Sequence, residues 1–179
     1  VLPAQDGGNY PTKHMFDYSV LSSLRAEQIL INACRGEVLD NKALLKLFRE
    51  VPNTMPTIVL DCWENEPTIE VGLIPHLALC TAHIAGHSLE GKARGTDMVY
   101  AELCRFLGIV PEHQLLDFLP AFEPDLGFQK MLSNVDLATS SQTIVSQCIR
   151  SMYDIENDDS FFRRYMAESA SFSEIRRNY

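Results

Sequence analysis

Three short apolar runs constrain the fold of this chain more than any other feature. They are QILINA at residues 28–33, TIVLDC at 57–62 and LCTAHIA at 79–85, and polar or ionisable residues lie at or just beyond the end of each. Runs of this length are typical of buried parallel strands. Between the first two runs, the sequence predicts a helix over 40–51 with Asp40 as its N-cap. This order of elements predicts an α/β fold with a parallel sheet covered on both faces.

The remainder of the chain divides into two further segments. A long helix is predicted from Ser88 to Leu107, because the pattern is helical and Gly108 can end it. After Pro111 the composition changes to a tail with more prolines and aromatic residues. We therefore expect three parts with these boundaries: 1–87, 88–111 and 112–179.

Composition excludes several classes of function. The net charge is −9 and no basic stripe is present, so we expect no nucleic-acid partner. No apolar run reaches the roughly 18 residues of a membrane span, so we expect no membrane partner. Five cysteines without a C-x-x-C spacing argue against a disulfide framework and favour a reducing, cytoplasmic location. No G-x-G-x-x-G motif occurs, and we expect the chain to be an internal piece of a longer protein.

Ionisable side chains follow the three predicted strands. Arg35 follows the first, Glu66 the second, and His83 lies near the end of the third. The carboxyl ends of parallel strands meet at one edge of a sheet, where ligands collect. A guanidinium can bind a carboxylate, a histidine can carry a proton, and a glutamate can hold the imidazole. The trio predicts a general acid–base site, although each residue alone is more simply a surface charge or a structural histidine.

Other histidines give no such signal. His83 and His87 have a helical metal-ligand spacing, but a turn separates them and no third ligand is near, so we expect no metal site. We interpret His14, His76 and His113 as structural.

Three blocks carry a family resemblance: ILINACRGEVLDNKALL, VLDCWENEP and TAHIAGHSLEGKARGT. They resemble the signature blocks of the D-isomer-specific 2-hydroxyacid dehydrogenases. The tail, through LLDFLP, MYDIENDD and FSEIRRNY, is similar to the dimerisation domain of one member that acts on a phosphorylated hydroxy acid. The resemblance implies the C-terminal part of a Rossmann-like NAD-binding domain (1–87), a long connecting helix (88–111) and a small, incomplete α+β dimerisation module (112–179).

The resemblance also implies roles for individual residues. Arg35 would bind the substrate carboxylate, Glu66 would orient the histidine, and His83 would be the catalytic acid and base. His87, where the resemblance would place a tyrosine, would be a second substrate contact beside Arg35. The implied contacts to NAD are Ala33, Cys34, Arg35, Asp61 and Gly86.

The expected function is NAD-dependent oxidation of a small phosphorylated 2-hydroxy acid by a homodimer. Two alternatives stay open: a family member of the phosphoglycerate or hydroxypyruvate reductase type, and a non-catalytic, NAD-sensing dimeric scaffold. Because the family's glycine-rich phosphate turn has no counterpart here, we expect these 179 residues to be inactive alone.

Overall fold

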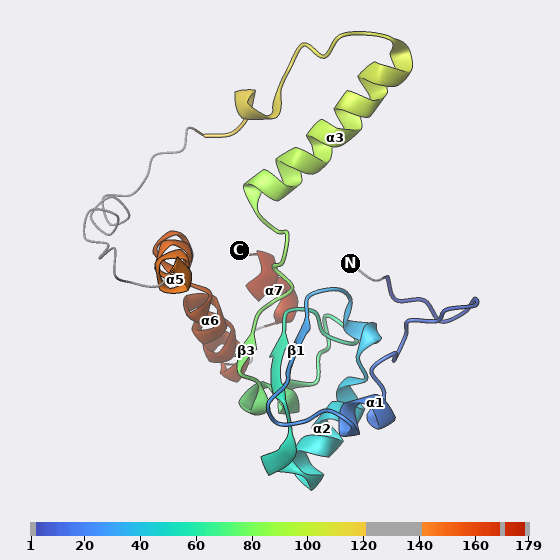
Figure 1. Ribbon diagram of the computed structural model, residues 1–179, viewed down its shortest axis with the longest axis vertical. Helices are drawn as coiled ribbons and strands as arrows, with labels where there is room; N and C mark the ends of the chain where they lie inside the picture. The colour runs from blue at the N-terminus through green and yellow to red at the C-terminus, as the bar shows by residue number, and fades with distance from the viewer. Residues whose placement is uncertain (1–2, 121–140, 169–170, 178–179) are drawn as a thin grey trace. The chain divides into compact units, whose positions relative to one another are not determined.

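The computed structural model describes residues 3–120, 141–168 and 171–177 (Figure 1). Its contacts divide the chain into two compact units. The first combines Val1–Ala85 with Asp158–Tyr179, and the second is Gly86–Asn157. The C-terminal residues from Asp158 therefore pack with the sheet, whereas the boundaries predicted from sequence group them with the tail. The assignment of 112–179 as a dimerisation module stays a prediction.

A parallel sheet forms the centre of the first unit. Its strands are β1 (Ile29–Asn32), β2 (Thr57–Leu60) and β3 (Leu79–Cys80), hydrogen-bonded in the order β1-β2-β3. Ile29 pairs with Thr57, and Val59 pairs with Leu79. The predicted α/β fold with a parallel sheet is confirmed.

The third strand is shorter than predicted. The run 79–85 forms only two strand residues, because the chain beyond Thr81 leaves the ladder. The backbone N–H of His83 donates to the carbonyl of Asp61 at 2.8 Å, and the N–H of Ile84 donates to the Asp61 carboxylate at 2.7 Å. His83 therefore lies in a turn beyond the strand end.

Local capping signals place two helices in this unit. Asp17 caps α1 (Tyr18–Ser22) and Asp40 caps α2 (Asn41–Glu50), each through a backbone N–H three residues on. The predicted cap at Asp40 is confirmed. The apolar face of α2 enters the core with Leu44 and Leu47. Short 3-10 turns connect these elements: η1 (Gly36–Val38), η2 (Pro52–Thr54) and η3 (Val71–His76).

The C-terminal helices complete the same core. They are α6 (Ile155–Ala167) and α7 (Phe172–Arg177). Phe162, Phe172 and Ile175 are buried in one cluster with the sheet residues. The ring of Phe162 lies 5.5 Å from that of Trp63, centre to centre. Apolar burial of this kind, rather than any local signal, holds these two helices to the first unit.

A polar clamp fixes α6 to β3 and the turn before it. Arg163 donates to the carbonyls of Ile74 at 2.6 Å and Leu77 at 2.8 Å, and to Asp159 at 2.8 Å. Asp159 in turn accepts from the backbone N–H of Cys80 at 2.7 Å. Within the described sheet β3 is an edge strand, so this bond satisfies an N–H that points away from β2.

We expect Arg163→Ala to lower the free energy of unfolding by about 2 kcal/mol, because two partly buried carbonyls and Asp159 lose their donor. Urea denaturation measures this, with Arg164→Ala as the control. Within the described ranges the exposed Arg164 side chain stacks on the rings of Phe161 and Tyr165, so its loss should cost about 0.5 kcal/mol. Equal effects of the two substitutions would contradict the clamp.

The contribution of this clamp depends on pH. Burial raises the pKa of Asp159, but the hydrogen bonds from Arg163 and Cys80 outweigh it and hold that pKa below its ordinary value. A carboxyl of this kind stabilises the fold above its unfolded pKa, and the stabilisation is lost as pH falls through the folded value. The difference between wild type and Arg163→Ala should therefore shrink in acid.

The second unit contains α3 (Leu89–Leu107), η4 (Leu115–Asp117) and α5 (Ser141–Met152). The predicted long helix is confirmed: Ser88 caps α3, and Gly108, with a φ of 66°, ends it in the left-handed conformation. Met98, Val99 and Phe106 of α3 are exposed. None of the helices in the described ranges is long and apolar enough to cross a membrane.

The five cysteines differ in reactivity. Burial raises the pKa of Cys62 to about 12 and that of Cys80 to about 12, while Cys34 and Cys148 are partly exposed. Only the thiolate reacts with alkylating reagents. At about pH 8, iodoacetamide should therefore label Cys34 and Cys148 and spare Cys62 and Cys80. Peptide mass spectrometry checks this, and equal labelling of Cys62 and Cys34 in the folded protein would contradict it.

Candidate active site

The structure brings two of the predicted residues, Glu66 and His83, into direct contact. Nδ1 of His83 lies 2.7 Å from Oε2 of Glu66, and both side chains are about 20% exposed. The other carboxylate oxygen accepts the backbone N–H of Trp63 at 2.8 Å. An ionised carboxylate only accepts, so Nδ1 carries the proton of this bond. In the neutral imidazole Nε2 then keeps its lone pair, and within the described part of the chain it has no hydrogen-bond partner. This is the tautomer that a base requires.

His83 is held in an unusual backbone conformation. Its φ is 57°, in the left-handed region that non-glycine residues seldom occupy. Hydrogen bonds fix the turn on both sides, since its N–H donates to the Asp61 carbonyl and its own carbonyl accepts from Nε of Arg176 at 3.2 Å. Backbone strain of this kind clusters at functional sites.

Asp61 organises the same turn. Its carboxylate is buried and accepts from the Thr81 hydroxyl at 2.7 Å, from the N–H of Ile84 at 2.7 Å and from the N–H of Ala85 at 3.1 Å. Three bonds to one buried charge fix the path of the chain on either side of His83. The predicted contact between Asp61 and NAD stays a prediction.

Arg35 lies in the turn after β1, where its side chain is exposed. Its Nη1 donates to the carbonyl of Cys34 at 2.8 Å, and in the described ranges it makes no ion pair with Glu66. Asn32, which is buried, holds this turn: its amide donates to the Arg35 carbonyl at 3.0 Å and accepts from the N–H of Cys34 at 3.2 Å. Ala33 beside them is exposed. That the Arg35 side chain meets those of Glu66 and His83 thus stays a prediction.

The backbones of the Arg35 and Glu66 segments nevertheless touch. A Cβ on Gly36 would overlap the carbonyl group of Trp63 and the backbone nitrogen of Glu64. Only glycine allows this approach. The turn that carries Arg35 and the loop that carries Glu66 therefore form one packed unit.

Gly86 and His87 belong to the second compact unit. Gly86 has a φ of 76°, and Nε2 of His87 lies 3.2 Å from Nζ of Lys92. Their predicted roles toward NAD and the substrate stay predictions.

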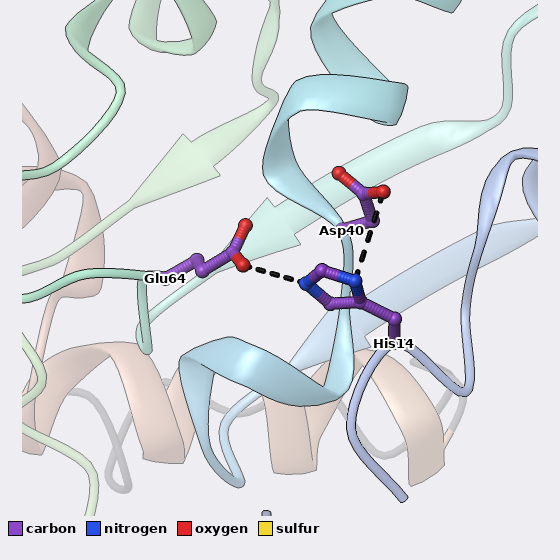
Figure 2. Close-up of side chains that lie close together, drawn as sticks. All are labelled: His14, Asp40 and Glu64. Atoms are coloured by element: carbon purple, nitrogen blue, oxygen red, sulfur yellow. Dashed lines mark hydrogen bonds and ion pairs between the residues drawn. The ribbon is translucent and has the colours of Figure 1, made fainter. Parts of the chain in front are cut away.

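Sequence reasoning missed His14, whose partners lie far along the chain. Figure 2 shows its ring between two carboxylates: Nε2 is 2.6 Å from Oε1 of Glu64, and Nδ1 is 3.8 Å from Oδ2 of Asp40. These three residues could offer ligands to a metal ion. Here the two carboxylates face opposite ring nitrogens, so the arrangement is an ion-pair network. The only sequence signal for this network was the run of acidic residues at 61–66.

Comparison with known proteins shows what the N-terminal part of the first unit resembles. Residues 8–85 match the model of the D-isomer specific 2-hydroxyacid dehydrogenase NAD-binding domain. This stretch is similar to the NAD-binding domain of that family. The resemblance seen in the blocks around Arg35, Glu66 and His83 is thereby confirmed.

Curated relatives extend the similarity over 99% of the chain. It is 46% identical over 178 residues to the erythronate-4-phosphate dehydrogenase of Pseudoalteromonas atlantica, of which it covers 46%. It is 41% identical to the enzyme of that name from Colwellia psychrerythraea and covers 43% of it. It is 40% identical to the one from Shewanella baltica and covers 45% of it. The chain thus spans a little under half the length of these dehydrogenases.

Proposed function

We propose that the full-length protein containing this chain oxidises 4-phospho-D-erythronate to the 2-oxo acid with NAD, a step of pyridoxal phosphate biosynthesis. The observation that carries the proposal is the His83–Glu66 pair, with Nδ1 held by the carboxylate and Nε2 left as a base. The named relatives and the family match support the substrate and the cofactor.

The turn after β1 fits a bound NAD. Ala33 is small and exposed at the carboxyl end of a parallel strand, which is where such sheets bind nucleotides. We place contacts to NAD at Ala33, Cys34, Arg35, Asp61 and Gly86. The Asp61 carboxylate also fixes the His83 turn, by accepting the backbone N–H of Ile84. NAD, when bound, supplies the acceptor for the hydride of the substrate.

The residues of this chain supply binding and proton transfer. Arg35 holds the C1 carboxylate through its guanidinium, which among the described residues gives only one hydrogen bond, from Nη1 to the carbonyl of Cys34. As the hydride leaves C2, Nε2 of His83 takes the hydroxyl proton, and Glu66 stabilises the resulting imidazolium. A placed base of this kind contributes about 10²- to 10⁴-fold in rate. Reduction in the reverse direction uses the same histidine as the acid.

We also propose a homodimer in the cytoplasm. The exposed apolar residues of α3 support self-association, and five free cysteines are consistent with a reducing compartment. We propose in addition that His87 contacts the substrate.

Initial rates of NADH formation test the proposed substrate. The full-length protein should show a higher kcat/KM for 4-phospho-D-erythronate than for 3-phosphoglycerate. A value at or below that for 3-phosphoglycerate would favour another family member. Absence of turnover with any 2-hydroxy acid, together with NAD binding, would favour the non-catalytic scaffold.

A further inference from the structure

The loop after β2 carries two glutamates, and the structure pairs each with a different histidine. Glu66 bonds to His83, while Glu64 bonds to His14, which lies 50 residues earlier in the sequence. The first pair is the proposed catalytic machinery. The His14–Glu64 pair has no part in the mechanism above. The question is why the fold holds this pair so close to the catalytic loop.

Glu64 is the more enclosed of the two glutamates, at 9% exposure. Its Oε1 lies 2.6 Å from Nε2 of His14, and its Oε2 accepts the backbone N–H of Asn41, the first residue of α2, at 3.2 Å. A carboxylate is favoured at a helix N-terminus by the helix dipole. Asp40, the N-cap of the same helix, faces the other nitrogen of His14 (Figure 2). Glu64 thus joins the N-terminal segment and α2 to the loop after β2.

His14 has little freedom to move away from this position. Its φ is 50°, in the left-handed region, and its backbone N–H donates to the carbonyl of Glu37 at 2.7 Å. Glu37 lies in η1, directly after the Gly36 contact with Trp63. The histidine is therefore anchored to the same turn that carries Arg35.

The position of Glu64 determines where Glu66 can point. Only Asn65 separates them, and its φ of 62° turns the chain sharply. On the other side of Glu64, Trp63 is buried, its ring nitrogen donates to the Thr81 carbonyl at 2.8 Å, and its N–H donates to Glu66. The loop is thus held at Trp63 and Glu64, on the residues just before Glu66, whose carboxylate faces Nδ1 of His83.

We propose that His14 and Glu64 are positioning residues for the Glu66–His83 pair. This role rests on the function proposed above and acts through Glu66, without contact between His14 and the substrate or NAD. Without the His14 bond, the Glu64 side chain and the loop backbone shift relative to His83. Misplacement of a catalytic group by about 1 Å costs roughly 10²-fold in rate, so small shifts of the loop are enough.

The test is His14→Gln in the full-length enzyme. We expect kcat for 4-phospho-D-erythronate to fall about 10- to 100-fold, with an unchanged KM for NAD. His76→Gln is the matched control and should leave kcat unchanged, since His76 is exposed and its side-chain contact in the described part of the chain is a stack on the ring of Phe48. Glu64→Gln, which keeps the size of the side chain, should lower kcat in the same way.

Two readouts separate positioning from a general loss of structure. In a Glu66→Gln background, adding His14→Gln should lower kcat by less than about twofold, because residues that act through one another are not additive. In ¹⁵N-histidine NMR, the Nδ1–H signal of His83 should change in His14→Gln and stay unchanged in His76→Gln. These spectra report on folded molecules even where a variant loses stability.

The outcomes are distinguishable from failure of the proposed function. An inactive wild-type enzyme would overturn the function itself. An active wild type with unchanged kcat in His14→Gln, or with additive losses in the double variant, would overturn the positioning role alone.

Discussion

Replacing His83 by alanine in the full-length protein is expected to lower kcat about 10³-fold, within the range that a placed general base contributes. The reason is that Nε2 of His83 is the base left free once Glu66 holds Nδ1 at 2.7 Å. Affinity for NAD, measured by fluorescence titration, should stay close to that of the wild type. The variant therefore separates proton transfer from cofactor binding.

His113→Ala provides the matched control for this substitution. His113 lies in the second unit, with its ring 5.5 Å from that of Phe118, and has no part in the proposed chemistry. It should turn over at the wild-type rate. Wild-type kcat in His83→Ala would rule out the catalytic role of His83.

Replacing Gly36 by alanine is expected to lower the free energy of unfolding by about 3 kcal/mol, which is at the upper end for overpacking. The added methyl group would overlap the backbone of Trp63 and Glu64. Backbone atoms cannot rotate aside as a flexible side chain can, so the whole loop must shift. Urea denaturation measures the loss, and the same shift should displace Glu66 and reduce turnover.

Gly7→Ala controls for the loss of backbone freedom. A Cβ at Gly7 meets nothing within 4 Å. Its stability should stay within about 0.5 kcal/mol of the wild type. A Gly36→Ala protein as stable as Gly7→Ala would show that the Arg35 turn and the Glu66 loop are not packed as described.

Elements whose signals are local could be predicted from sequence. Asp40 was expected as an N-cap, Ser88 as the start of the long helix and Gly108 as its end, and all three are confirmed, because capping depends on residues within one turn. The end of β3 could not be predicted, because it is set by Asp61, whose carboxylate lies some twenty residues away in sequence. The apolar stripe at 135–155 also predicts a helix, of which Ser141–Met152 forms α5, while residues 135–140 lie outside the described residues.

The candidate site also has parts that could be predicted from the sequence and parts that could not. The blocks around Glu66 and His83 predicted a paired carboxylate and imidazole, and the structure places them in contact. The supporting network could not be predicted, since His14 and Glu64 are 50 residues apart. The packing of Phe162 and Phe172 against the sheet core could not be predicted either, because apolar residues on a helix do not reveal which surface they cover.

Imidazole rescue of His83→Ala tests the central claim most directly. If the lost group is a base that works through its ring nitrogen, added imidazole should raise the turnover of 4-phospho-D-erythronate in this variant and have no such effect in Arg35→Ala, where the missing group binds the carboxylate. A His83→Ala enzyme that does not respond to imidazole, or an Arg35→Ala enzyme that responds equally, would contradict the assignment.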